Sequence, residues 1–162
     1  MNNKSETYFK DLPLRRIALW AFVLNALWEF GQCTLLYDMW DWGFWRGSLW
    51  MWGAIAGDVV IVLAIVIVGV ILAGADHLNP PDGGGWLALI STSFVASILL
   101  EWLALYLELW DYSALMPTLD VFGFSVGLSP IVQITLLPSL SIWLAFRQTV
   151  TASDERRLSV KQ

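Results

Sequence analysis

The sequence predicts an all-α membrane protein, a single domain of residues 1–162 whose four transmembrane helices form an up-down bundle. Of the 162 residues, 57% are hydrophobic, whereas a soluble domain averages about 45–50%. The excess is concentrated in four long runs, and only 14% of the residues are charged. Because most charges lie outside these runs, each run is expected to cross a bilayer as a helix.

The first helix is expected at residues 13–37, after a polar segment that Pro13 closes. The run is too long for a signal peptide and carries Glu29, so we interpret it as a retained helix. Asn25, Glu29 and Gln32 are spaced i, i+4, i+7 and therefore share one stripe of the helix. A carboxylate that faces lipid costs about 3 kcal/mol or more, so this stripe is expected to face protein or a water-filled cavity.

The second helix is expected at residues 48–75, after the loop 38–46, which is rich in Trp and Asp. Tryptophans at the end of a membrane helix indicate an aromatic belt at the interface. Gly53 and Gly57 form a G-x-x-x-G motif, which allows another helix to approach closely. Asp58 follows directly, so a close helix contact and a buried acid are expected on one turn.

The third helix is expected at residues 86–110, after a turn at 77–85 that is rich in Pro and Gly. Glu101 and Glu108 are seven residues apart and so share a face of this helix. The following stretch, 113–128, is apolar but broken by Pro and Gly. This pattern predicts a segment that lies at the interface or dips into the membrane as a lid.

The last helix is expected at residues 129–146, because Ser129 followed by Pro130 is a typical helix start. Gln133 lies near that start. Residues 147–162 are polar and are expected to form a cytoplasmic tail.

The basic residues are distributed unevenly along the chain. Eight of the nine Lys and Arg residues lie near the two termini, and only Arg46 lies in the opposite loops. The positive-inside rule then predicts a multi-pass protein of the cell inner membrane with both termini in the cytoplasm. In that orientation Glu29, Asp58 and Glu101 all fall in the outer half of the membrane, and Gln133 lies at the same depth.

These acids have no intramembrane Lys, Arg or His beside them in the sequence. Like charges so close in a low dielectric cannot all stay ionised. Three interpretations follow: a carboxylic acid that donates a proton, a bound cation, or neutral acids that hydrogen-bond the helices together. Because the acids come from three helices, spacing alone does not indicate a metal site, and we predict no metal and no cofactor.

The segment Asn25-x-x-Trp28-Glu29 resembles the N-x-x-W-E motif of the integral-membrane terpene cyclases of fungal meroterpenoid pathways. The resemblance covers this one helix. It implies that a helix-borne glutamate, with a second acid on a later helix, protonates an epoxide or alkene and starts a carbocation cyclisation.

Most of the chain is also similar to a family of small uncharacterised bacterial membrane proteins, a resemblance that implies no established activity. The residues that carry it are Trp28-Glu29-Phe30-Gly31-Gln32, Glu101-Trp102, Trp110-Asp111-Tyr112-Ser113, Met116-Pro117-Thr118 and Gly127-Leu128-Ser129-Pro130 with Gln133.

From these observations we predict an enzyme of the cyclase or isomerase type that acts by acid catalysis on a lipophilic isoprenoid or lipid. Glu29 is the expected proton donor, and Asp58 and Glu101 are expected to tune it or to act as base. The faces of Trp28 and Trp102 are candidates to stabilise a carbocation by cation–π contact. The residues expected to bind the substrate are Asn25, Trp28, Gln32, Trp102, Glu108 and Gln133.

Two alternatives remain open at this point. The first is a small proton-coupled transporter or binder of lipophilic cations, which would need to form a homo-oligomer because no duplicated half is visible. The second is a structural subunit of a larger membrane complex. The formal charge of −5 and the lack of a basic stripe exclude a nucleic-acid binder. The expected partners are therefore the membrane and a lipid or lipophilic small molecule.

Overall fold

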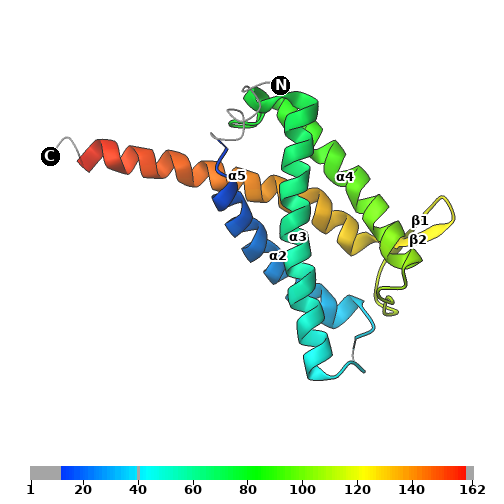
Figure 1. The fold of residues 1–162 in the computed structure, drawn as a ribbon. Coiled ribbons are helices and arrows are strands. Elements are labelled where there is room, and N and C mark those ends of the chain that lie inside the picture. The colour runs from blue at the N-terminus through cyan, green and yellow to red at the C-terminus, as the bar shows by residue number, and fades with distance from the viewer. Residues whose placement is uncertain (1–11, 40, 160–162) are drawn as a thin grey trace, which may run out of the picture.

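The computed structural model describes the backbone of residues 12–39 and 41–159 and the side chains of 12–39 and 41–148. In Figure 1, α3 lies in front and α2 and α5 pass behind it, while α4 diverges to one side. The elements in chain order are α2 (Leu14–Leu36), α3 (Phe44–Ala73), the 3-10 helix η1 (Ala75–His77), α4 (Gly83–Tyr106), β1 (Thr118–Val121), β2 (Phe124–Gly127) and α5 (Leu128–Ser159).

Three of these helices are long and apolar enough to cross a membrane: α3, α4 and the Leu128–Gln148 part of α5. The prediction of a mostly helical membrane protein is confirmed in this form. The prediction of four spans is wrong for the first helix, because α2 is not among the three. Its first turn carries Arg15 and Arg16, and its second half carries the polar stripe, which together make it less apolar than the others. The basic residues Lys4, Lys10, Arg156, Arg157 and Lys161 lie outside the described side chains.

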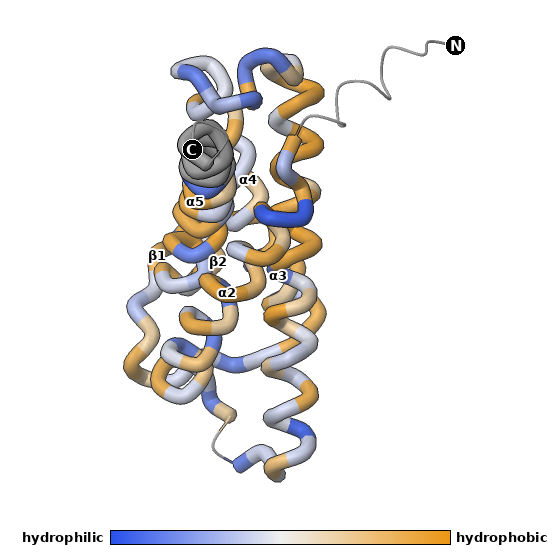
Figure 2. The backbone as a smooth tube through the Cα atoms, turned by 90° about the vertical axis from the view of Figure 1, so that its left-hand side faces the viewer, coloured by the Kyte–Doolittle hydropathy of each residue, from blue (hydrophilic) through white to orange (hydrophobic). Residues whose placement is uncertain are grey.

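The second half of helix α2 has its polar stripe inside and most of its apolar side chains outside. Glu29 is only 5% exposed, whereas Leu27 is 70% exposed and Leu35 is 58% exposed. A surface helix of a soluble protein has the opposite arrangement. Figure 2 shows the wider pattern, with hydrophobic residues along the helices and hydrophilic residues concentrated in the connections between them.

The apolar core lies where α3 and α4 meet, next to η1. At this point a Cβ on Gly69 of α3 would lie 3.1 Å from Cδ2 of Leu89 on α4, so the two helices are in close contact. In Figure 1 they separate from this end toward the other. The fully buried side chains of the core include Ile17, Val66, Leu78, Leu89 and Ile142.

Helix α4 begins at Gly83, earlier than the predicted residue 86, so the predicted turn at 77–85 ends at Asp82. Asp82 is the N-cap, and its Oδ1 accepts a hydrogen bond from Gly85 N at 2.9 Å. A Cβ on Gly85 would lie 1.9 Å from the backbone oxygen of His77, so no side chain fits there. The three glycines therefore form the first turn of α4, and Gly85 packs closely against the backbone of His77.

Three other helix boundaries also differ from the predictions. Helix α3 begins at Phe44, so the tryptophan-rich loop is shorter than predicted. Helix α4 ends at Tyr106 and not at residue 110, because Glu108 adopts a positive φ of 52°. Helix α5 continues to Ser159, so the start of the predicted tail is helical.

The stretch predicted as an interfacial segment contains a β-hairpin. Strands β1 and β2 pair antiparallel, with Thr118 opposite Gly127 and Val121 opposite Phe124. The two turn residues, Phe122 and Gly123, have positive φ values of 52° and 84°, as a type I′ turn requires. The sequence prediction did not include strands, because each strand has only four residues and the alternation of Thr118, Leu119, Asp120 and Val121 is correspondingly short.

Candidate functional site

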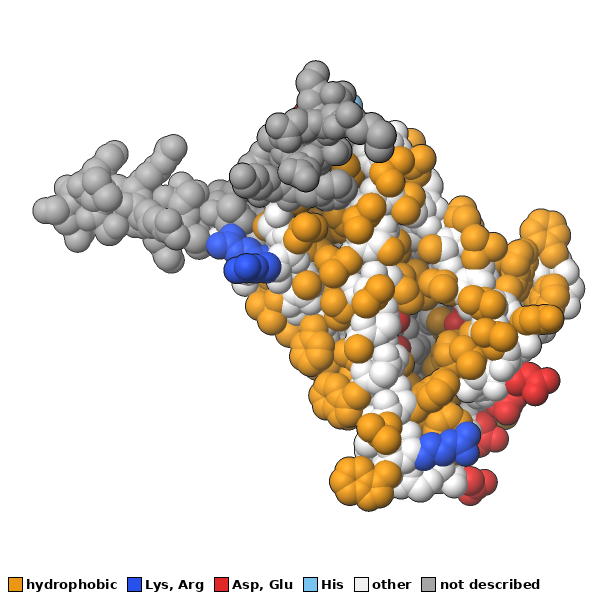
Figure 3. Space-filling model, viewed as in Figure 1, with side chains coloured by type: hydrophobic (Ala, Val, Ile, Leu, Met, Phe, Trp, Pro, Cys, Tyr) orange, Lys and Arg blue, Asp and Glu red, His pale blue; other side chains and the backbone are white. Residues whose placement is uncertain are grey.

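A cavity of about 230 Å³ lies among the four helices. Residues of α2, α3, α4, α5 and the loop after α4 line it. Figure 3 shows a hollow in the face formed by α3 and α4, with acidic side chains visible inside it. Its polar lining is formed by Glu29, Gln32, Asp58, Glu101 and Gln133.

Gln32 of α2 is fixed by hydrogen bonds on both sides of its amide. Its Nε2 donates to Glu29 Oε1 at 2.6 Å and to Gln133 Oε1 at 2.7 Å. Its Oε1 accepts from Trp28 Nε1 at 3.0 Å and from Ser129 Oγ at 2.8 Å. Because both amide hydrogens and both oxygen lone pairs are used, the side chain has one fixed orientation.

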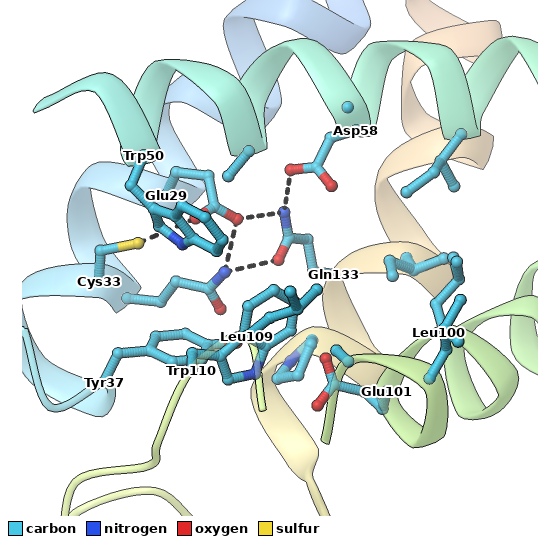
Figure 4. Close-up of a pocket in the computed structure, with 18 of the residues that line it drawn as sticks. Glu29, Cys33, Tyr37, Trp50, Asp58, Leu100, Glu101, Leu109, Trp110 and Gln133 are labelled. Atoms are coloured by element: carbon cyan, nitrogen blue, oxygen red, sulfur yellow. Dashed lines mark hydrogen bonds between the residues drawn. The ribbon is translucent and has the colours of Figure 1, made fainter. Parts of the chain in front are cut away.

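Gln133 of α5 connects α2 to α3 at the centre of the site (Figure 4). Its Nε2 lies 2.8 Å from Glu29 Oε1 and 2.8 Å from Asp58 Oδ2. The same nitrogen lies 3.0 Å from Asn25 Oδ1. An amide nitrogen carries only two hydrogens, so it satisfies two of these three acceptors at a time.

The carboxyl groups of Glu29 and Asp58 share one donor, because Glu29 Oε1 and Asp58 Oδ2 each lie 2.8 Å from Gln133 Nε2. Cys33 Sγ donates to the remaining Glu29 oxygen, Oε2, at 3.0 Å. These two carboxyl groups, which we call the carboxyl pair, are therefore surrounded by donors from two amides and a thiol.

Glu101 of α4 lies apart from this pair and has its own partner (Figure 4). The hydroxyl of Tyr112 donates to Glu101 Oε2 and accepts from Gly127 N at 3.0 Å. Burial raises the pKa of Tyr112, and its hydrogen bond to Glu101 raises that pKa further. The phenol therefore keeps its proton at neutral pH and remains a donor to Glu101.

Three aromatic side chains complete the cavity walls: Tyr37, Trp50 and Trp110. Tyr37 is 6% exposed. Burial raises the pKa of Tyr37, and the negative charge of Glu101 adds to this effect. Tyr37 and Trp110 make an edge-on ring contact with centroids 5.8 Å apart. The cavity thus combines a polar floor with aromatic walls.

The structure brings together most of the residues that the sequence analysis selected, but not all of them. Glu29, Asp58 and Glu101 line the one cavity together with Gln32 and Gln133. Asn25 contacts Gln133 from behind the cavity wall, and Trp28 lies outside the wall and holds Gln32.

Two selected residues lie elsewhere. Trp102 packs against the hairpin, with its ring centroid 6.1 Å from that of Phe122 and 5.8 Å from that of Phe124. Glu108 is exposed beyond the end of α4. The prediction placed Glu108 on the same helical face as Glu101 because it extended the helix to residue 110. Helix α4 ends at Tyr106, so Glu108 does not share that face.

Some residues of the site were not selected from the sequence. Trp50, Ala54 and Asp58 are spaced four residues apart and therefore share one face of α3. This spacing could have identified Trp50 as a neighbour of Asp58 in the site. Tyr112 and Trp110 belong to the loop after α4, and no periodicity indicates where a loop residue points.

The G-x-x-x-G motif of α3 does not mediate a close helix contact within the chain, so that prediction is wrong. A Cβ on Gly53 or on Gly57 would meet no atom within 4 Å. Gly57 lines the cavity instead. The two glycines leave open space where a second helix was expected.

Among the side chains of residues 12–39 and 41–148, no cluster of His, Cys, Asp and Glu has the arrangement needed to hold a metal ion. Comparisons with protein-family models, with curated proteins and with solved structures find no match to this chain. The geometry of the site is therefore the basis for a functional proposal.

Proposed function

We propose that the protein is a membrane-embedded enzyme that isomerises or cyclises a lipophilic substrate by proton transfer. One observation carries the proposal: the carboxyl pair, Glu29 with Asp58, shares a cavity with a separate carboxyl group, Glu101. In the proposed reaction the pair carries the proton that is donated. Acid catalysis followed by base catalysis needs two such groups in different environments. Aromatic walls and the lack of Lys, Arg and His in the lining favour an apolar substrate that becomes cationic during reaction.

In the first step the Glu29–Asp58 pair gives its proton to one carbon of a substrate double bond. The π electrons form the new C–H bond, and the neighbouring carbon becomes cationic. The faces of Trp50, Trp110 and Tyr37 stabilise this cation, and the pair, now without its proton, balances the charge. The amide hydrogens of Gln32 and Gln133 stabilise the negative charge left on the pair.

In the second step Glu101 takes a proton from a carbon next to the cationic centre. The electrons of that C–H bond form the new double bond, so the product is an isomer of the substrate. If a second double bond first attacks the cation, the product is a ring. The proton then returns from Glu101 to the pair, and the cycle consumes no oxidant, reductant or cofactor.

The three helices that are apolar enough to span a membrane support a location of the cavity within the membrane. A single chain supplies every group that the reaction needs, so the proposal does not require an oligomer.

A binder or transporter of lipophilic cations is the second candidate. The negatively charged lining favours it, because Glu29, Asp58 and Glu101 have no basic residue among the lining side chains. The enzyme is preferred because the carboxyl pair accepts hydrogen bonds from the amides of Gln32 and Gln133, which lowers its attraction for a cation.

The test is the exchange of solvent deuterium into a substrate. Protein in membrane vesicles is incubated in D2O with farnesol or geranylgeraniol, and mass spectrometry measures deuterium bound to carbon. Glu29→Gln keeps the shape of the side chain but removes its proton, so exchange is expected to fall by about 10²–10⁴-fold with an unchanged Tm. Glu108→Gln is the matched control, because Glu108 is exposed outside the cavity, and is expected to exchange like the wild type.

Full exchange in Glu29→Gln would contradict the proposed role of the carboxyl pair. A wild-type protein that exchanges nothing, but binds tetraphenylphosphonium in competition with protons and loses this binding in Glu29→Gln, would support the cation binder instead.

A further inference from the structure

A second hollow, of about 590 Å³, adjoins the acidic cavity. Trp50, Ala54 and Trp110 line both spaces. The outer hollow also contacts Arg46 and Leu49, at the end of α3 that begins after the tryptophan-rich loop. The two spaces therefore lie next to each other along α3, and together we call them the α3 groove.

The α3 groove is long and narrow. Arg46, Trp50, Ala54 and Asp58 recur every four residues, so they lie along one face of α3. The rise from Arg46 to Asp58 is about 18 Å at 1.5 Å per residue. The outer volume of about 590 Å³ lies in the range of small-molecule sites. An extended chain fits these dimensions better than a compact ligand does.

Small residues keep the α3 groove free of protein. A Cβ on Gly53 or Gly57 would meet no atom within 4 Å, whereas a Cβ on Gly69 of the same helix would touch Leu89 at 3.1 Å. The groove therefore lies in the part of α3 from which α4 has diverged, and the side chains of α4 do not fill it.

The α3 groove opens sideways between two helices that are apolar enough to span a membrane. Figure 3 shows the hollow in this lateral face, with hydrophobic side chains on both of its sides. Leu49 on α3 is 73% exposed and Leu103 on α4 is 51% exposed. In a bilayer such an opening faces acyl chains and not water.

We infer that the α3 groove seats the chain of a single-chain lipid, which enters sideways from the bilayer between α3 and α4. The polar head lies at the Arg46 end, and the far end of the chain reaches Asp58 and Glu29. This inference names the substrate class for the proposed function. It rests on the proposed function only for the reaction at the acidic end of the groove.

The head group is neutral, such as a hydroxyl. The guanidinium of Arg46 lies 3.9 Å from the ring centroid of Trp42, so it is held at this end of the groove as a hydrogen-bond donor. The same end of the molecule carries the exposed acids Asp38, Asp41 and Glu108, which disfavour an anionic head.

The experiment fills the groove and measures binding of radiolabelled farnesol to the purified protein in detergent. Gly57→Leu adds a side chain in open space, so it is expected to fold with an unchanged Tm. Burying one methylene is worth about fourfold in affinity, so displacing about two of them weakens binding by about fifteenfold. Gly31→Leu on α2 is the matched control, since its Cβ also meets nothing within 4 Å, and it is expected to bind like the wild type.

Gly53→Leu, in the outer hollow, is a second and independent variant and is expected to weaken binding in the same way. Wild-type affinity in both leucine variants would overturn the inference. A wild-type dimer that either leucine variant converts to a monomer, with farnesol binding unchanged, would also overturn it, because a helix of a second copy would then occupy the groove.

The inference and the proposed function fail in distinguishable ways. If Gly57→Leu removes farnesol binding, the inference that the α3 groove binds the lipid chain is supported. If the wild type also shows no deuterium exchange, the acid catalysis is contradicted. If Glu29→Gln abolishes deuterium exchange and Gly57→Leu leaves it at the wild-type level, the acid catalysis is supported. The same result overturns the inference that the lipid chain binds in the α3 groove.

Discussion

The two halves of the helix bundle differ in how closely α3 and α4 approach each other. In the half next to η1, a Cβ on Gly69 would already touch Leu89, and the core is fully packed with apolar side chains. In the half next to the loop 37–43, Gly53 and Gly57 face open space, and the buried groups include acids and amides beside a small apolar cluster. The same helix thus supplies a packed region and a hollow one.

This difference shows how a small bundle keeps a cavity open. The packed half fixes α3 against α4 at one end, and their divergence then leaves room at the other end. The polar residues Glu29, Asp58 and Gln133 hold the hollow half together by hydrogen bonds, which do not require close packing of the helices. We therefore expect stability to depend mainly on the packed half and binding or activity on the hollow half.

The largest expected effect on stability is a difference between alanine substitutions at two leucines of α4. Leu89 is fully buried in the packed half, so Leu89→Ala is expected to lower the free energy of unfolding by about 2–5 kcal/mol. Leu100 lines the existing cavity and is partly exposed, so Leu100→Ala is expected to cost less than about 1 kcal/mol. Denaturant unfolding in detergent measures both. Equal losses would mean that the two halves are packed alike.

A smaller effect is expected at the connection between the hollow half and the hairpin. Tyr112→Phe removes the donor to Glu101 and the acceptor for Gly127 N, so it is expected to cost about 1–3 kcal/mol. Tyr106→Phe is the control, because Tyr106 is 79% exposed, and its unfolding free energy is expected to change little. An unchanged Tm in Tyr112→Phe would show that the hairpin is held by its apolar contacts alone.

The smallest effect is expected at the N-cap of α4, and it depends on pH. The hydrogen bond from Gly85 N, together with that from His77, lowers the pKa of Asp82 below its usual value. Its contribution to stability is therefore full above the ordinary aspartate pKa of about 3.9 and is lost as the pH falls through the lower pKa of the folded state.

The Tm of Asp82→Ala is accordingly expected to lie slightly below that of the wild type at neutral pH. The difference should disappear in acid, in a pH series of thermal unfolding curves. Asp76→Ala, in η1, serves as the control for losing an exposed aspartate of the same connection. A Tm difference that stays constant down to the lowest pH would contradict capping by the ionised side chain.

The sequence by itself determined the helical class and the side of each helix that carries polar groups. Helical periodicity sets which residues share a face, so the positions of Asn25, Glu29 and Gln32 on one stripe of α2 followed from spacing alone. The cost of a charge in lipid then indicated that this stripe faces inward, and Glu29 is buried as expected. Length and apolar content alone overestimated the number of spans, because α2 carries its polar stripe within the apolar run.

Only the tertiary structure decided which acids meet, because distances between helices depend on where the helices cross. It pairs Glu29 with Asp58 through Gln133, and it gives Glu101 to Tyr112 of a loop that has no periodicity to follow. It also turns Gly53 and Gly57 from an expected helix contact into the floor of the α3 groove, since α3 and α4 diverge before they reach these residues. Spacing along one helix states which face a side chain occupies, but only the packing of neighbouring helices states whether that face meets a side chain or an empty space.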